Sequence, residues 1–458
     1  MTPRRITQNL AAILLFALIA VACGGSSTPQ ATTTDRDVVV SDGATEDADP
    51  EQSGYGGTAQ PAEESQEAPL FDPTAVDLPY DVSPSAEPND EDVQILTGNP
   101  RDLLHPTAAS ISGLWTTDWS RTTIDIGELR AGLRGEDPRD GIPPIDRPLF
   151  ESVTAASEWL QPTEPGALVS LDGDVRFYPL SIMTRHEIVN DRFGNVPVAI
   201  TFCPLCNTAL AFDARVDGQR LRFGVSGLLR KSDLVMWDRQ SETLWQQISG
   251  TGVIGEYAGT ELALVPTSIV SFGDFSATHP DGLSLSRETG FGTSYGTNPY
   301  TGYSSGAGPI PAFFPEELDD RLPPMARVVS VIDDDAVTAY PFSAVSETGL
   351  IADQVGDLSI AIFWGGATTD ALDGQSIANS EQIGSAIAYL AEFEGQPLTF
   401  TPNGDDTFTD AETGTTWNLL GAGISGENEG ETLTIAPHRN EFWFAFAGFF
   451  PEGKLWES

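Results

Sequence analysis

The stretch Val196-Pro-Val-Ala-Ile-Thr-Phe-Cys-Pro-Leu-Cys206 joins a continuous apolar run to two cysteines that are separated by two residues. A short apolar run bounded by turn residues predicts a strand that is buried on both faces. Cys23 is the one other cysteine of the chain, so Cys203 and Cys206 indicate a local site rather than a disulfide framework. A pair at this spacing can hold a metal ion, cycle between dithiol and disulfide, or form a static disulfide.

Short β-rich runs alternate with turn residues on both sides of this stretch. The segments that predict strands are 166–171, 196–202, 221–225 and 262–265. Asp172-Gly173 and Asp217-Gly218 predict tight hairpin turns. Residues 179–189 and 207–212 predict helices, and the second of these follows the cysteine pair directly. The whole pattern predicts a strand-dominated α+β fold.

The folded region contains the same unit twice. The matching segments are 174–181 with 335–343, 196–200 with 358–362, 217–223 with 394–400, 238–245 with 410–417, and 266–282 with 437–453. Five matches in the same order predict an internal duplication. We therefore expect two tandem related domains, a first domain at 96–310 and a degenerate second copy at 320–458. The second copy lacks the cysteines, which favours a functional role for the pair in the first domain.

The N-terminal residues 1–23 have the pattern of a bacterial lipoprotein signal peptide. Arg4 and Arg5 precede an apolar segment at 10–21, and small residues precede Cys23. Lipidation of Cys23 would anchor the protein to the extracytoplasmic face of a membrane in the bacterial cell envelope. Residues 24–95 are rich in Ser, Thr, Pro, Gly and acidic residues, which predicts a disordered acidic tether.

The chain is strongly acidic, with a formal net charge of −44, and Lys231 and Lys454 are its two lysines. This charge excludes nucleic acid as a partner, because phosphate contacts require basic residues. The expected partners are the membrane, through Cys23, and a protein of the cell envelope.

A metal site at the cysteine pair requires further ligands, because two ligands hold an ion weakly. His186 and His279 are the natural candidates, since the second copy has no histidine at either matching position. Two thiolates and two imidazoles suit zinc, and they also suit copper, to which Met236 could add a thioether. The sequence thus predicts Cys203, Cys206, His186 and His279 as ligands of zinc or copper.

Other interpretations stand beside the metal site. A strand, the cysteine pair and a helix in succession also resemble a thioredoxin-like redox site. A Cys203–Cys206 disulfide in a non-catalytic envelope scaffold is the third alternative. The adjacent His186-Glu187 suggests acid–base chemistry, and the charged stretch 233–245 is interpreted as a turn region that pairs arginine with acids.

Several long motifs give the chain a recognisable resemblance. The motifs are His186-Glu-Ile-Val-Asn-Asp191, Pro197-Val-Ala-Ile-Thr-Phe-Cys-Pro-Leu-Cys-Asn-Thr-Ala209, Phe223-Gly-Val-Ser-Gly227 and Asp233-Leu-Val-Met-Trp-Asp-Arg239. They resemble the bacterial family called domain of unknown function 3179, over about residues 110–310 and more weakly to the C-terminus. The resemblance implies an exported or envelope-attached bacterial protein, and it carries no established activity.

Overall fold

The computed structural model describes residues 92–133, 135–305 and 313–457, which all lie in one compact unit. The described residues form many short strands and six α-helices, so the predicted strand-dominated fold is confirmed. No described helix is long and apolar enough to cross a membrane. Cys23 and the predicted tether up to residue 91 lie outside the described residues.

The described residues up to 305 are here called the first half, and they form three main sheets. One sheet runs β1 (Gln94–Ile95), β2 (Arg121–Thr122), β15 (Thr251–Ile254), β14 (Leu244–Gln246), β13 (Asp233–Asp238), β12 (Phe223–Arg230) and β3 (Arg130–Ala131). A second runs β16 (Leu264–Val265), β9 (Thr208–Asp213), β8 (Val196–Cys203) and β7 (Ile188–Phe193). The third runs β17 (Thr267–Ser271), β5 (Pro165–Leu171), β6 (Asp174–Pro179), β18 (Leu283–Leu285) and β4 (Phe150–Ser152). The helices are α1 (Pro106–Ala109), α2 (Val153–Ala156), α3 (Leu180–His186) and α4 (Phe272–Thr278).

Residues 313–457, here called the second half, form three further sheets. The first of these sheets runs β30 (His438–Phe442), β19 (Arg327–Asp333), β20 (Ala336–Pro341) and β31 (Lys454–Leu455). The next runs β21 (Leu350–Val355), β22 (Leu358–Gly365) and β23 (Ser385–Leu390). The last runs β26 (Phe400–Pro402), β27 (Thr407–Asp410), β28 (Thr416–Asn418) and β29 (Gly423–Ser425). The helices are α5 (Phe342–Thr348) and α6 (Trp443–Phe449). Two small ribbons, β10 (Arg215–Val216) with β11 (Gln219–Arg220) and β24 (Glu392–Phe393) with β25 (Gln396–Pro397), complete the described strands.

The two predicted hairpin turns are confirmed. Asp172 and Gly173 both have positive φ, at 52° and 81°, and they join β5 to β6 with Leu171 opposite Asp174. Asp217 and Gly218 join β10 to β11 in the same way, at 50° and 72°. Positive φ at both central residues is the geometry of the type I′ turn, which matches the twist of the strands.

The helix predicted at 207–212 is wrong, because this segment is strand β9, which pairs antiparallel with β8. An apolar run this short has no periodicity that separates a helix from a buried strand, so its pairing decides the outcome. The helix predicted at 179–189 forms only as α3, which ends at His186. Glu187 then adopts a left-handed conformation, with φ 58°, and β7 begins at Ile188.

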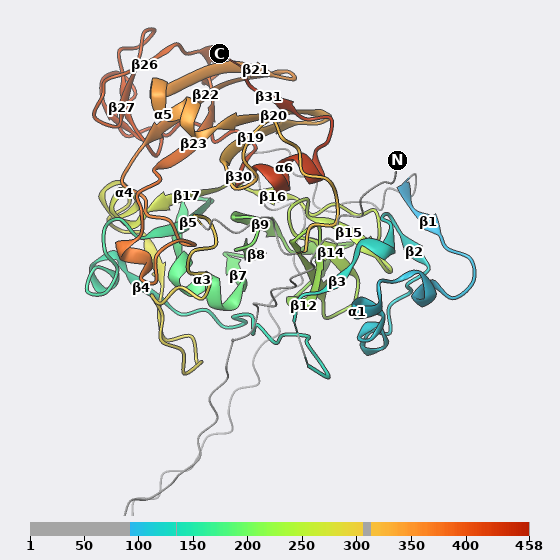
Figure 1. Ribbon diagram of the computed structural model, residues 1–458. Coiled ribbons are helices and arrows are strands. Elements are labelled where there is room, and N and C mark those ends of the chain that lie inside the picture. Colours follow the sequence, from blue (N-terminus) through green and yellow to red (C-terminus); the bar gives the residue numbers. More distant parts are fainter. Residues whose placement is uncertain (1–91, 134, 306–312, 458) are drawn as a thin grey trace, which may run out of the picture. The chain divides into compact units, whose positions relative to one another are not determined.

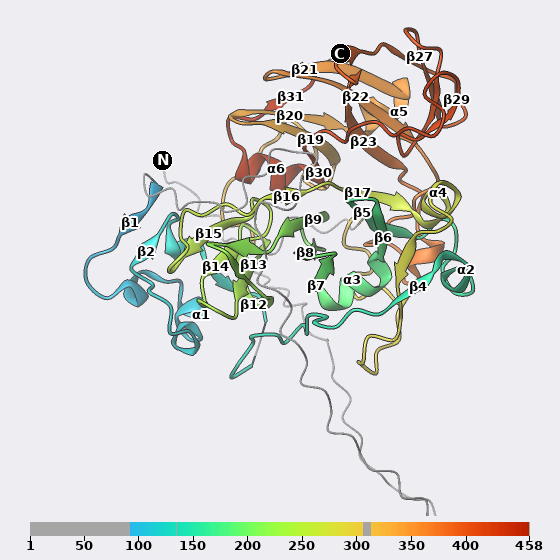
Figure 2. The ribbon, with the colours of Figure 1, turned by 180° about the vertical axis from the view of Figure 1, so that it is seen from behind.

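The two halves share their apolar cores. One core cluster joins the interior of β8 and β9 to Phe442, Phe444 and Ala445 of the second half. Another joins Phe177 and Phe272 to residues of the second half such as Phe363. Both views show β30 beside β9 and β17 (Figure 1 and Figure 2), as their contacts require. The second half is therefore in a position to shape the surroundings of the cysteine pair.

Candidate metal centre

The cysteine pair forms the turn of the β8–β9 hairpin. Cys203 is the last residue of β8 and lies opposite Thr208, the first residue of β9. The Cys206 amide donates to the Cys203 carbonyl at 3.2 Å, and Asn207 closes the turn with φ 58°. The two side chains are buried, with 2% and 0% exposure, and both thiols are free.

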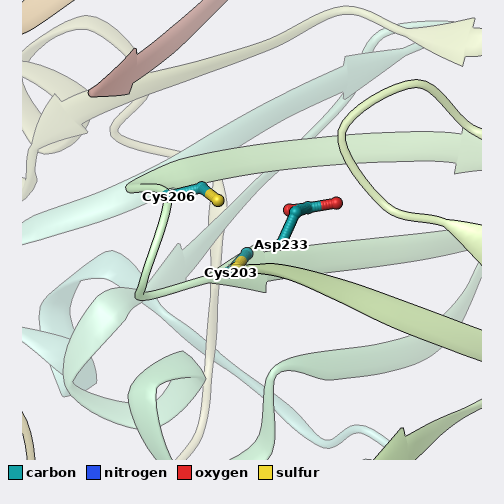
Figure 3. A group of neighbouring side chains, drawn as sticks. All are labelled: Cys203, Cys206 and Asp233. Carbon is teal, nitrogen blue, oxygen red and sulfur yellow. The ribbon is translucent and has the colours of Figure 1, made fainter. Parts of the chain in front are cut away.

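Asp233 lies against the two thiols (Figure 3). It is the first residue of β13, and one carboxylate oxygen and the two sulfur atoms all lie within 4.8 Å of one another. Its Oδ2 accepts hydrogen bonds from Gln246 Nε2 at 2.6 Å and from the Ile248 amide at 3.0 Å. Its Oδ1 is buried and receives no N–H or O–H hydrogen bond from the described residues, so only weak S–H donors are left to it. A buried carboxylate oxygen without a strong donor is an available ligand atom.

Burial controls the protonation of Cys203, Cys206 and Asp233. It raises the pKa of both thiols above the ordinary value, and the negative charge of Asp233 raises them further. Burial also raises the pKa of Asp233 to about 6, although the hydrogen bonds from Gln246 and Ile248 lower it. The thiols are therefore protonated at neutral pH, which is the opposite of the activated thiolate that a disulfide-exchange site requires.

Two further buried carboxyl groups lie near the three ligand candidates. Burial raises the pKa of Glu187 to about 7, and the Tyr300 hydroxyl donates to its Oε1 at 3.1 Å. Burial likewise raises the pKa of Glu441 to about 7, and the charge of Asp233 adds to this effect. Glu441 is 0% exposed, and the hydrogen bond from Ser330 and the charge of Arg439 offset the effect of burial only in part. The buried Arg439 guanidinium interacts with Glu441 and Asp233 and balances part of this negative charge. The remaining excess of acidic groups around the cysteine pair favours a bound cation.

The structure does not bring the two candidate histidines into this group. His186 Nδ1 lies 2.6 Å from the Pro143 carbonyl oxygen, and its Nε2 lies 2.7 Å from the Tyr295 hydroxyl, so both ring nitrogens are already engaged. His279 follows the last residue of α4, and its ring lies 6.0 Å from that of Phe275. Met236 is fully buried on β13, in the same core cluster as the cysteines.

The chain matches a known family over residues 139–453, a range that includes most of both halves and all the acidic groups described above. The chain belongs to the DUF3179 family. This family is described as a protein of unknown function. No curated protein and no solved structure matches the chain. The DUF3179 match extends well beyond the segment in which the sequence motifs carry the resemblance.

Sequence reasoning missed two residues of this DUF3179 site. Asp233 was expected in a turn region that pairs arginine with acids, whereas it begins a strand and faces the thiols. No turn signal in the sequence marks the start of this strand, because Lys231 and Ser232 are not residues that favour positive φ. Glu441 lies on β30, 235 positions after Cys206 in the sequence, and no motif marks it.

Proposed function

We propose that this DUF3179 protein binds one zinc ion through Cys203, Cys206 and Asp233. The observation that carries the proposal is the convergence of two sulfur atoms and an available carboxylate oxygen in a fully buried position. Two thiolates with one carboxylate give a divalent ion three protein ligands, which leaves a fourth tetrahedral position for water or another small ligand. An open fourth position is typical of zinc sites that act on a substrate rather than only holding the fold together.

Copper is the second candidate, because two soft sulfur ligands also suit Cu(I). The carboxylate favours zinc, since hard oxygen ligands bind Cu(I) poorly. The redox alternative has less support, because β9 follows the cysteine pair where a thiol-activating helix would be needed. The static disulfide has less support as well, because both thiols are free.

We further propose that the protein is a lipoprotein of the bacterial cell envelope, anchored through Cys23 on the extracytoplasmic face of a membrane. The charged, apolar and small-residue segments before Cys23 support this proposal. The strong negative charge supports a protein or small ligand, and not a nucleic acid, as the partner.

We also propose that the second half is a duplicated copy of the first. The order hairpin, helix, hairpin occurs as β5–β6–α3–β7–β8 and again as β19–β20–α5–β21–β22. The sheets β17–β5–β6–β18 and β30–β19–β20–β31 have the same pairing, with a parallel last pair in each. In the second half, β22 ends at Gly365 without a cysteine hairpin, so the copy would retain the scaffold and lack the metal ligands.

Metal analysis of the full-length chain tests the metal proposal. The protein is purified in detergent under anaerobic, reducing conditions, loaded with Zn(II) or Cu(I), and freed of loosely bound ions. We expect about one zinc per chain, and we expect Cys203→Ser and Asp233→Asn to lose it. His279→Ala is the matched control, and it should bind zinc as the wild type does. Less than about 0.1 metal per wild-type chain would refute the proposal.

A further inference from the structure

The turn that delivers Asp233 to the thiols is strained. Lys231 and Ser232 form a two-residue turn between β12 and β13, with Arg230 opposite Asp233. Their φ angles are 49° and 66°, so two residues with a Cβ occupy the left-handed region. Strain of this kind persists only where the surrounding structure holds it, and it gathers at functional sites.

No other described two-residue turn places two residues with a Cβ in the left-handed region, although Asp334 alone lies in that region between β19 and β20. Asp172-Gly173, Asp217-Gly218 and Glu394-Gly395 each have positive φ at both positions, and each has glycine second. Glycine adopts such angles without a steric penalty. In the second half, the hairpin β26–β27 corresponds to β12–β13, because it follows strand β25 just as β12–β13 follows strand β11. Its loop at 403–406 is longer than the two-residue turn of β12–β13. The strained lysine–serine turn is therefore specific to the hairpin that carries Asp233.

The side chain of Lys231 explains how the strained turn is held. Its Nζ donates to the Gly448 carbonyl at 2.9 Å and lies 2.7 Å from Glu316 Oε1. Gly448 lies in the last turn of α6, where carbonyl groups lack helical partners and attract a cation. The Lys231 side chain is only 12% exposed. This lysine therefore fastens the turn to two segments of the second half.

The next residue connects the turn to the site itself. The Ser232 carbonyl lies 3.9 Å from Cys203 Sγ, and the Ser232 hydroxyl accepts a hydrogen bond from the Phe313 amide at 3.3 Å. Asp233 follows at once, so a shift of the turn would move the carboxylate away from the thiols. We propose that Lys231 is a positioning residue, which holds Asp233 in place for metal binding by fixing this turn against α6.

This inference rests on the proposed metal site, and its test separates the two. The full-length chain is loaded with Co(II) as a spectroscopic substitute for zinc, and zinc affinity is measured by competition with a chelator. We expect Lys231→Met to bind zinc about tenfold more weakly, the effect typical of losing an outer support of a metal ligand. The sulfur-to-cobalt charge-transfer bands should persist, while the d–d bands, which report the ligand geometry, should change.

Matched variants decide the outcome. Lys454→Met removes the other lysine, on β31, and should leave affinity and spectrum unchanged. Lys231→Arg keeps a cation at α6 and should recover most of the affinity. Lys231→Gly removes the ammonium group and also relieves the backbone strain, so this variant should still fold. Its zinc affinity should fall as that of Lys231→Met does. Wild-type affinity and spectrum in both Lys231→Met and Lys231→Gly would overturn the inference, whereas a wild type without metal would refute the proposed function instead.

Discussion

Glu441→Gln should make the apo protein more stable at alkaline pH. The carboxyl group is fully buried, and burial raises its pKa from an ordinary 4.5 to about 7, although a hydrogen bond from Ser330 and the charge of Arg439 lower it. The folded state therefore holds this proton more tightly than the unfolded state does. Stability consequently falls as the pH rises from about 4.5 to about 7, and above pH 7 the full penalty remains. Glutamine has nearly the same shape and carries no titratable proton, so it removes this dependence.

The size of the effect follows from the pKa shift. The rise of the pKa from 4.5 to about 7 corresponds to a penalty of about 3.5 kcal/mol, since each tenfold change in proton affinity is worth about 1.4 kcal/mol. Between pH 5 and pH 8 the wild type should lose most of this amount relative to Glu441→Gln.

Chemical denaturation of the full-length chain at pH 5 and pH 8, with EDTA and a reductant, measures both free energies of unfolding. Glu427→Gln, an exposed position on the same half, is the matched control and should follow the wild type. If the wild type and Glu441→Gln lose stability in parallel between the two pH values, the carboxyl group does not titrate as the burial argument requires.

Three further predictions concern the site and the repeated scaffold. Zinc affinity should rise between pH 6 and pH 8, because the raised pKa values of the thiols mean that binding must release their protons; a competition assay with no pH dependence would contradict this. Tyr303→Phe removes a hydroxyl that donates to the Leu205 carbonyl at 2.9 Å, so the cysteine turn should open more often and the thiols should be alkylated severalfold faster in native protein. Asp410→Ala should destabilise the fold by about 2 kcal/mol, because the buried Trp417 Nε1 loses its acceptor at 2.8 Å; an unchanged denaturation midpoint would argue against it.

Local patterns predicted the scaffold well where sequence alone determines the geometry. The apolar run 196–202 became the buried strand β8, and the Asp-Gly pairs became type I′ turns. The segment 207–212 failed because its strand character comes from pairing with β8, which lies outside any local window. That error mattered for function, because a helix at this place would have favoured activated thiols.

The ligand set was harder to predict, because it depends on contacts between distant segments. Cys203 and Cys206 were identified from their spacing, and the structure places them together. His186 was chosen as a rare ligand type, but sequence does not reveal that both its ring nitrogens already have partners. Asp233 is one of many acids in a chain with 67 acidic residues, so its residue type carried little information.

X-ray absorption spectroscopy of the zinc-loaded, full-length protein tests the central claim most directly. Zinc–sulfur and zinc–oxygen distances differ by about 0.2 to 0.3 Å, so the method separates the two kinds of ligand. We expect two sulfur ligands at about 2.3 Å and oxygen ligands at about 2.0 Å, without the outer-shell scattering of an imidazole ring. A zinc ion bound by imidazole, or a protein that retains no zinc, would contradict the account.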